Sequence, residues 1–399
     1  MSEPRFRRGP TPVYVAKGIR VFVSGLLSIV IPFYLKVAGF GIYFQGLALV
    51  AILAGNAASN VAVTYLDWSG RRRLLQGFSL LMVASGATLA TSASPVLILA
   101  ACFIGNISST GTEAGPFQSI EAGTLPELAG AQTSVNAFAR YNFIGYSAAA
   151  VGQLASAGPG LFGNAIDSFR AVFVGFALVG AALFVIYSRL DAIESGRATR
   201  PGLANLSPQA KKDTARLSGL FVMDAFGGVF VTTYLLSIWF NVRYGLQLEA
   251  LGPVFFVAAL IAAGSVYGAA RIARRLGNLR TMVYTHLVSN VLLIMMGLAG
   301  ALLPAVALLF LRQSMSQMDV PTRQALMTEM FQREERVQAY AVTNTLRSTG
   351  SFFAGPVAAG ILGLGAVSAI PFVGGGVKVV YDLATYFSFR KRYRRRPLD

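Results

Sequence analysis

Long apolar segments separated by short polar connections run through the whole chain. A transmembrane helix takes about 20 mostly apolar residues and satisfies its own backbone hydrogen bonds in hydrocarbon. The pattern therefore predicts an all-α integral membrane protein with about twelve transmembrane helices. The predicted spans cover residues 13–36, 43–66, 74–91, 95–122, 134–157, 169–190, 216–240, 250–273, 281–303, 304–329, 337–364 and 366–389.

One connection differs from the others in length and character. It is polar and charged, and Pro201 and Pro208 interrupt it. Such a stretch is typical of a linker, and it divides the spans into two pseudo-symmetric sets. We expect a six-helix bundle over residues 1–190, a cytoplasmic linker over residues 191–215, a second six-helix bundle over residues 216–389 and a basic cytoplasmic tail over residues 390–399.

A basic turn recurs at the same place in each set. Arg73 follows Gly70 after the second span, and Arg280 follows Gly277 after the eighth. The two glycines and the two arginines are each 207 residues apart (277 − 70 and 280 − 73). A duplicated membrane bundle with a basic loop in each half is the usual plan of a two-lobed transporter.

An acid followed by a proline also recurs. Glu113 in the fourth span precedes Asp319 in the tenth by 206 residues (319 − 113), and Pro116 and Pro321 follow these acids. Each proline removes a backbone donor and loosens its helix where the chain already carries polar groups. Coincidence in a sequence rich in alanine and glycine is the alternative interpretation.

Small residues are dense in the fifth and eleventh spans, at residues 145–152 and 350–360. These spans are predicted to face the other bundle, where small residues let helices approach closely and slide. Packing alone explains these residues equally well.

Composition agrees with a membrane protein, because 54% of the residues are hydrophobic, the mean hydropathy is +0.58 and only 13% are charged. A typical soluble domain is about 25% charged. The net charge of +17 gathers at the termini and at the even-numbered connections. This asymmetry predicts a multi-pass protein of the cytoplasmic (inner) cell membrane with both termini in the cytoplasm. The charges lie on separate loops, so we expect membrane lipids and no nucleic acid as partners.

The residue types give little indication of a metal site or an enzyme active site. The single cysteine, Cys102, excludes an internal disulfide and argues against a thiolate metal site. The single histidine, His286, lies in an apolar run and is interpreted as a packed or snorkelling residue. No local motif supplies a nucleophile with a base, so we predict no enzyme, no metal site and no cofactor.

The first basic turn resembles the loop signature of the major facilitator superfamily, in which a small residue and an aspartate precede Gly-Arg-Arg. Residues 111–117 and 316–324 also look like a poorly characterised prokaryotic branch of that superfamily. The resemblance implies two six-helix bundles and a cytoplasmic gate that Asp67 holds closed. The expected gate residues are Asp67, Gly70, Arg71, Arg72, Arg73, Arg274, Gly277 and Arg280.

Charged residues at membrane depth are costly and are functional by default. Asp224, beside Gly227 and Gly228 in the seventh span, is the strongest proton-coupling candidate, and a fixed structural salt bridge is its alternative role. The further coupling candidates are Asp319, Glu113 and Asp382. Possible counter-charges or anion contacts are Arg20, Arg312, Arg323 and Arg347.

These features predict a secondary active transporter that moves a small solute by alternating access as a monomer, with proton coupling and efflux as working hypotheses. The fifth span lacks the Gly-Pro motif of many drug antiporters, and Gly355-Pro356 lies in the eleventh instead. Two alternatives remain. One is a flippase of lipid or lipid-linked substrates with the same fold, and the other is a membrane receptor or scaffold that does not transport.

Overall fold

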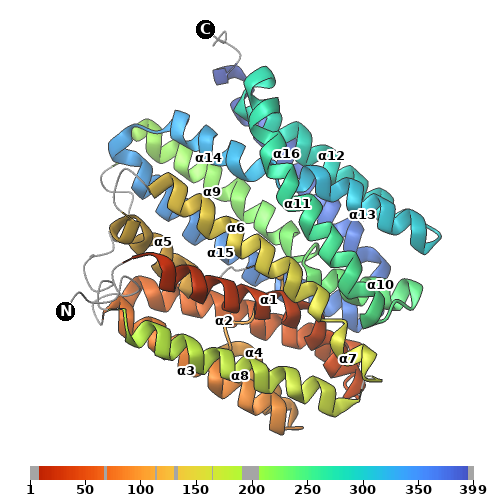
Figure 1. Ribbon diagram of the computed structural model, residues 1–399. Coiled ribbons are helices and arrows are strands. Elements are labelled where there is room, and N and C mark those ends of the chain that lie inside the picture. The colour runs from red at the N-terminus through yellow and green to blue at the C-terminus, as the bar shows by residue number, and fades with distance from the viewer. Residues whose placement is uncertain are drawn as a thin grey trace. The chain divides into compact units, whose positions relative to one another are not determined.

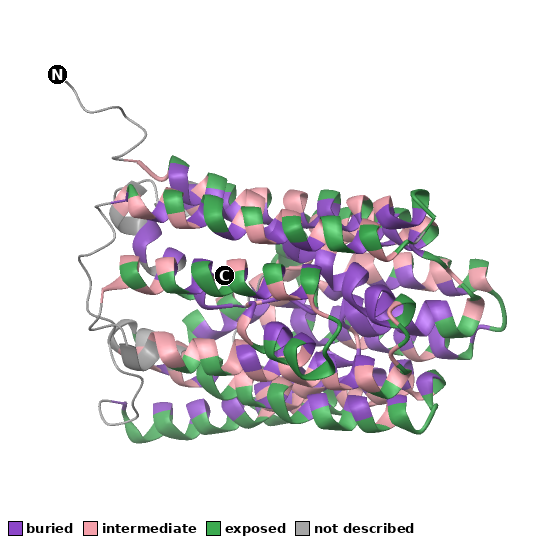
Figure 2. Ribbon diagram, turned by 90° about the horizontal axis from the view of Figure 1, so that it is seen from below, coloured by how far each residue is buried: buried purple, intermediate pink, exposed green. Residues whose placement is uncertain are grey.

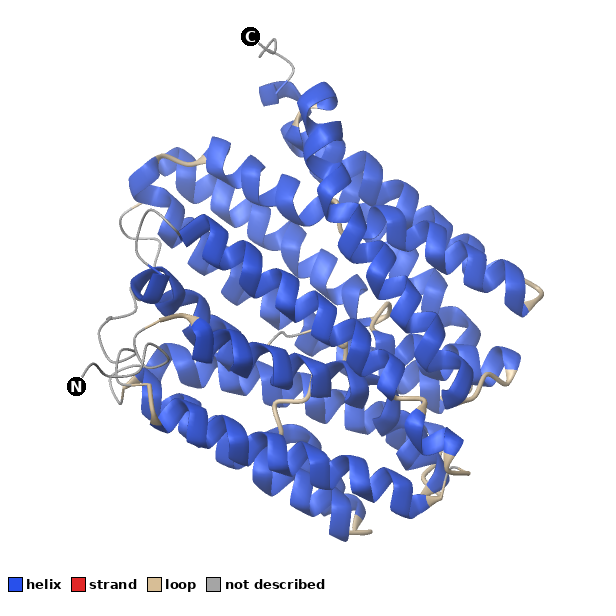
Figure 3. Cartoon of the chain, in the orientation of Figure 1, coloured by secondary structure: helices blue, strands red, loops and turns tan. Residues whose placement is uncertain are grey.

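A computed structural model describes residues 9–66, 70–112, 115–129, 134–163, 165–190 and 206–393. Over these residues the protein is built from helices joined by short loops, and they contain no strand (Figure 3). Eight of the helical segments are long and apolar enough to cross a membrane. The predicted all-α class is therefore confirmed.

The helices of the N-terminal half reproduce the first six predicted spans, with the fourth divided in two (Figure 1). They are α1 (Thr11–Val37), α2 (Ile42–Leu66), α3 (Arg71–Thr91), α4 (Pro95–Ile104), α5 (Pro116–Ala129), α6 (Ser134–Ala155), the short α7 (Gly158–Leu161) and α8 (Ile166–Ser188).

The helices of the C-terminal half reproduce the remaining spans. They are α9 (Pro208–Val229), α10 (Thr233–Tyr244), α11 (Leu248–Leu276), α12 (Asn278–Leu298), α13 (Leu302–Ser316), α14 (Asp319–Met330), α15 (Arg333–Gly363), the 3-10 turn η4 (Val367–Ala369) and α16 (Ile370–Tyr393). The eight candidate spans are joined by four further ones, which gives the predicted twelve. These four are α6, α15 and the two broken pairs α4/α5 and α13/α14.

The fourth and tenth spans were each expected to be one helix, and that expectation was wrong. The fourth stops at Ile104, resumes at Pro116 and continues to Ala129. The tenth stops at Ser316 and resumes at Asp319. Both breaks fall in the repeated acid-proline motifs, since proline begins α5 and lies in the first turn of α14.

The seventh span also differs from its prediction. It begins at Pro208, inside the expected linker, because the Ser207 hydroxyl accepts the Ala210 N–H and caps the helix. It is interrupted between Val229 and Thr233. Residues 191–205 of the linker lie outside the described residues.

The chain divides into two compact units, each considered by itself. Unit 1 comprises Met1–Ala198, Thr232–Phe256 and Leu362–Gly365, and unit 2 comprises Thr199–Val231, Val257–Ile361 and Ala366–Asp399. In unit 1, α1 packs on α6 and α8, α3 packs on α8, and α10 packs on α1. In unit 2, α12 packs on α13, α14 and α16, and α16 packs on α9.

The two basic turns share one backbone conformation. Gly70 has φ of 94° and directly precedes α3, whereas Gly277 has φ of 81° and directly precedes α12. Positive φ at this angle is readily adopted only by glycine. The repeat seen in the sequence is therefore also a repeat in local structure.

Glycine permits close helix packing within each unit. A Cβ atom on Gly152 of α6 would lie 1.9 Å from the Phe22 carbonyl oxygen of α1, and one on Gly350 of α15 would lie 2.2 Å from the Val222 carbonyl oxygen of α9. At these two positions the small residues of the fifth and eleventh spans permit close packing inside their own unit.

The helices differ in how far their residues are buried (Figure 2). In the most apolar window of α1, 78% of residues are buried, against 28% in α8. A charged side chain on α1 therefore lies inside protein, where it needs a partner.

Candidate functional site

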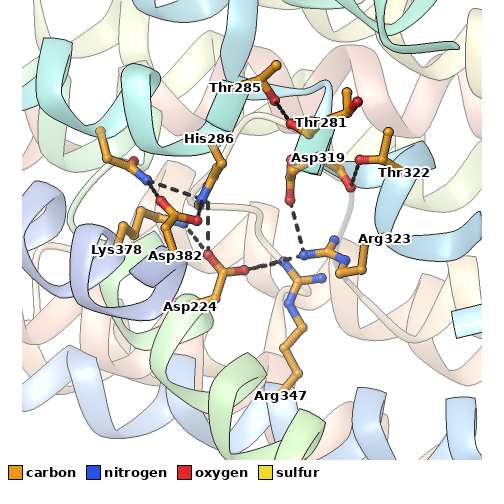
Figure 4. A network of polar contacts seen from close by, with 11 residues as sticks. Asp224, Thr281, Thr285, His286, Asp319, Thr322, Arg323, Arg347, Lys378 and Asp382 are labelled. Carbon is orange, nitrogen blue, oxygen red and sulfur yellow. Dashed lines mark hydrogen bonds and ion pairs between the residues drawn. The ribbon is translucent and has the colours of Figure 1, made fainter. Parts of the chain in front are cut away.

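Asp224 lies at the centre of a buried cluster of charged side chains in unit 2 (Figure 4). It is on α9 and is only 2% exposed. Lys378 on α16 donates a hydrogen bond from Nζ to Asp224 Oδ1 at 2.6 Å, and both side chains are buried. Because little water screens this pair, its charges interact strongly.

Two arginines approach the other carboxylate oxygen of Asp224. Arg323 Nη1 on α14 and Arg347 Nη2 on α15 each lie 3.5 Å from Asp224 Oδ2. Arg323 Nη1 also donates to Asp319 Oδ2 at 3.2 Å. A separation of 3.5 Å is long for a hydrogen bond, so the two guanidinium groups hold this oxygen loosely.

His286 connects Asp224 to a third carboxylate. Its Nδ1 atom, on α12, lies 2.7 Å from Asp382 Oδ1, and its Nε2 atom lies 3.9 Å from Asp224 Oδ1. Asn290 Nδ2 donates to Asp382 Oδ2 at 2.9 Å. An imidazole with its proton on Nδ1 donates to Asp382 and presents a basic Nε2 toward Asp224, and a second proton turns both contacts into ion pairs.

The cluster is balanced in charge. Three carboxylates, those of Asp224, Asp319 and Asp382, face two arginines and one lysine. With all six ionised and His286 neutral, the formal charge is zero. Burying such charges is tolerable only when they are paired, so each added proton changes the balance by one unit charge.

Helical spacing brings these groups together. Three i,i+4 pairs each share one helix face: His286 with Asn290, Asp319 with Arg323, and Lys378 with Asp382. These pairs converge on Asp224 from α12, α14 and α16 (Figure 4). Gly227, on α9, leaves room for the lysine, because a Cβ there would lie 2.9 Å from Lys378 Cγ.

Unit 1 holds a separate buried ion pair between Arg20 on α1 and Glu121 on α5. The guanidinium donates to both carboxylate oxygens, at 3.0 Å from Nη1 to Oε1 and 2.6 Å from Nη2 to Oε2. Tyr187 donates to Oε1 at 2.5 Å and Tyr141 to Oε2 at 2.7 Å. Both oxygens are therefore saturated by short bonds, as in a fixed structural pair that joins α1, α5, α6 and α8.

The structure sorts the sequence-predicted site residues into three groups. It brings together Asp224, Asp319, Asp382, Arg323 and Arg347. It places Arg20 with Glu121 and Arg312 with Gln313, without contact to Asp224. Glu113 and Asp67 lie outside the described residues.

Sequence reasoning missed Lys378, His286 and Asn290 in this cluster, and Glu121 in unit 1. Two of them carried a usable signal, because Lys378 and Glu121 are charged residues inside predicted spans, to which the same rule applies as to Asp224. His286 was interpreted as a packed or snorkelling residue. It is buried, and its contact with Asp382 adds a polar role that this interpretation did not include.

The predicted gate residues are only partly engaged in the described structure. Arg72 donates to the Ser188 carbonyl oxygen at the end of α8, and Gln76 donates to the Ser188 hydroxyl at 3.0 Å. A cation is favourable at the C-terminus of a helix. Three of the predicted arginines are exposed, namely Arg73, Arg274 and Arg280.

Buried charges inside long apolar helices, together with two interrupted spans, define a multi-pass membrane protein of the transporter class. Residues 137–356 match the sequence pattern of the Major Facilitator Superfamily, which is more than half of the chain. The chain belongs to this superfamily.

Its relatives agree with that assignment. An uncharacterized membrane protein of Saccharomyces cerevisiae is 25% identical over 383 residues, covering 86% of this chain and 85% of the relative. This relative is eukaryotic, so the resemblance is not confined to prokaryotes. The chain has the fold of the nucleoside transporter NupG, with TM-score 0.73, 12% identity, and 95% and 98% of the two chains covered.

Two further solved structures share the fold. A D-xylose-proton symporter has TM-score 0.71 at 15% identity, covering 94% of this chain and 97% of that one. A bacterial homologue of the iron transporter ferroportin, in an inward-facing state, has TM-score 0.72 at 11% identity, covering 99% and 100%. The protein is thus a transporter of this superfamily rather than an enzyme, and members of the family bind small-molecule substrates.

Proposed function

We propose that the protein is a secondary transporter that moves a small solute by alternating access and couples this movement to protons at the Asp224 cluster. The observation that carries the proposal is the arrangement around Asp224. One carboxylate is shared by Lys378, two arginines and His286 within 3.9 Å. A buried carboxylate with several competing cations can change partners when one proton is added.

The expected coupling step follows from the charges. A proton on Asp224 removes the anion that binds Lys378 and the two arginines, and the contact between α9 and α16 is weakened. The side chain of Arg347 is 40% exposed while that of Asp224 is 3% exposed, so the cluster is uncovered on the side of this arginine. A proton arriving at His286 or at a carboxylate changes which cation is free, and a solute can compete for that cation.

The fold relationship supports this proposal by analogy, since one protein of the same fold is a D-xylose-proton symporter. We further propose residence in the cytoplasmic membrane with both termini in the cytoplasm, action as a monomer, and efflux as one direction of transport. The proposed organisation keeps the first bundle at residues 1–190 and the tail at 390–399, whereas the second bundle begins at Pro208 and the linker is shortened to residues 191–207. The basic turns, with Asp67, are proposed to form the cytoplasmic gate.

The test is charge movement in proteoliposomes on a solid-supported membrane. The reconstituted protein is challenged in turn with D-xylose, uridine, lactate and Fe²⁺ at several pH values. Coupling predicts a solute-dependent current in the wild type that changes with pH and is absent in Asp224→Asn/Lys378→Met. This pair of substitutions removes the carboxylate and its closest cation together, which limits the cost to folding.

The matched control is Asp167→Asn, which removes a carboxylate whose side chain is 82% exposed. It should leave the current unchanged. A solute-dependent current that does not respond to pH would exclude proton coupling. A pH-dependent current retained in the double variant would remove Asp224 from the mechanism.

A groove in unit 2 supports one second candidate, the movement of an anionic lipid. It is open, measures about 500 Å³ and lies between α9 and α16, lined by Ala215, Arg216, Gly219, Leu220 and Ser388. An arginine above small and apolar residues suits a phosphate headgroup with an acyl chain. Scrambling of a fluorescent phosphatidylglycerol in proteoliposomes, reduced by Arg216→Gln, would favour this candidate, and no scrambling would dismiss it.

A further inference from the structure

Among the described residues, Arg312 is a buried cation without an acidic partner. It lies on α13 and is 7% exposed. Within the described part of the chain its one hydrogen bond runs from Nη1 to Gln313 Oε1, at 2.7 Å, and no carboxylate forms an ion pair with it. Its Nε atom is buried without a hydrogen-bond partner.

The depth of Arg312 makes this arrangement costly. It is ten residues from Leu302, where α13 begins. Ten residues of helix extend about 15 Å, which is half of a hydrocarbon core about 30 Å thick. A charge at that depth cannot reach the headgroups easily, and burying it without a partner is strongly unfavourable.

The acids of the Asp224 cluster do not supply the missing partner. The three carboxylates of the Asp224 cluster are bound by Arg323, Arg347, Lys378 and His286. No carboxylate of the described ranges pairs with Arg312, so a group from outside the chain can supply the balancing negative charge.

Local contacts prepare the guanidinium for such a group. Gln313 Oε1 accepts from Arg312 Nη1 and also from the Ser316 hydroxyl at 2.8 Å, which fixes one edge of the arginine. The Nε and Nη2 edge makes no hydrogen bond among the described residues. Two parallel N–H donors on that edge match the two oxygens of a carboxylate or a phosphate group.

We propose that Arg312 binds an oxyanion group of the transported solute, so that the substrate is a small organic anion with a carboxylate or phosphate group. This inference rests on the proposed transport function and names its substrate class. The same site also explains why the tenth span keeps a buried charge beside a break in its helix, because the substrate supplies the missing negative charge during part of the cycle.

The test is thermal unfolding of the purified full-length protein with sodium lactate, sodium benzoate, sodium phosphate, sodium chloride or D-xylose. Arg312→Met and Arg312→Lys are compared with the wild type, and Arg271→Gln, an exposed arginine of unit 2, is the matched control. A ligand that binds the folded state raises the unfolding temperature as its concentration exceeds its dissociation constant.

We expect an oxyanion to stabilise the wild type and Arg271→Gln. Its apparent affinity should fall roughly 10- to 100-fold in Arg312→Met, as charge-assisted hydrogen bonds are lost. Stabilisation by lactate or benzoate alone identifies a carboxylate, and stabilisation by phosphate alone identifies a phosphate group. Ligand-free Arg312→Met should unfold at a higher temperature than the wild type, since it removes an unpaired buried charge.

Three results would overturn the inference. The first is that sodium chloride raises the unfolding temperature as much as the oxyanions do. The second is that, at tens of millimolar, only D-xylose or no compound raises it. The third is a lower unfolding temperature of ligand-free Arg312→Met, which would give Arg312 a structural role. If one of these results is obtained and the proteoliposomes still show proton-coupled currents, the anion proposal fails and the transport proposal stands.

Discussion

Replacing Asp224 by asparagine should destabilise the protein more than its small change in shape suggests. Asp224 and Lys378 are both buried, and 2.6 Å separates their charged atoms. The side chain of asparagine leaves the ammonium buried without its anion. Breaking a buried ion pair by removing one partner costs about 3–5 kcal/mol, so we expect Asp224→Asn to lower the unfolding free energy by that amount.

The distances identify which cation is responsible for most of this cost. Coulomb energy falls with separation, so each arginine at 3.5 Å attracts Asp224 about three-quarters as strongly as Lys378 does at 2.6 Å. Arg323 also keeps Asp319 as a second partner. Lys378 is therefore the cation that loses the most electrostatic stabilisation when Asp224 is replaced.

A double-mutant cycle tests this reasoning. The free energy of unfolding is measured in mixed micelles for the wild type, Asp224→Asn, Lys378→Met and the double variant. The double variant should be more stable than Asp224→Asn, with a coupling energy of about 0.5–3 kcal/mol. Asp167→Asn, on an exposed carboxylate, should change stability by less than about 0.5 kcal/mol. If the losses of unfolding free energy in the two single variants simply add up to the loss in the double variant, the pairing is refuted.

Three other predictions concern packing, the ion pair of unit 1 and pH. Gly227→Ala should lower the unfolding temperature and impair proton coupling, because its Cβ would press on the lysine of the cluster. Gly264→Ala, on α11, meets no atom within 4 Å and should not lower the unfolding temperature. Glu121→Gln should cost about 3–5 kcal/mol in denaturation experiments, since it leaves a buried guanidinium without its anion. The Ser207 hydroxyl and N–H hold the pKa of Glu335 below its ordinary value of 4.5. This contact stabilises the start of α9 fully above that value and is lost as pH falls through the lowered pKa. The protection of amides there, measured relative to their intrinsic exchange rates at each pH, should therefore fall in acid, and equal protection in Glu335→Gln at neutral pH would contradict it.

The spans were predictable because a bilayer imposes a strong rule on sequence. Each spanning segment must be apolar over its whole length, so helices such as α1, α3 and α8 were placed within a few residues. The breaks were harder to locate. Proline marked the regions, but where the backbone leaves the helix depends on the packing of neighbouring helices, as in the contact of Asn56 with the Ile107 carbonyl oxygen.

The sequence predicted several residues of the charged site, but it did not predict which of them form ion pairs. Asp224, Arg323 and Arg347 were identified because ionisable residues are rare inside spans. Their partners could not be assigned, because three helices, α9, α12 and α16, have to converge before Lys378 and His286 meet Asp224. Spacing along one helix predicts only local pairs such as Asp319 with Arg323.

Glu121 and Asp224, two of the buried acids that bind arginine, differ in a way that bears on their roles. Glu121 accepts hydrogen bonds of 2.5–3.0 Å on both oxygens, and none of its partners can leave without exposing a charge. Asp224 makes one short contact, and its other three are 3.5 Å or longer. A saturated carboxylate resists exchange of partners, whereas a loosely shared one permits it at small cost. The same chemistry therefore fixes the helices of unit 1 and leaves unit 2 a carboxylate that can release one cation for another, as the proposed proton-coupled transport requires.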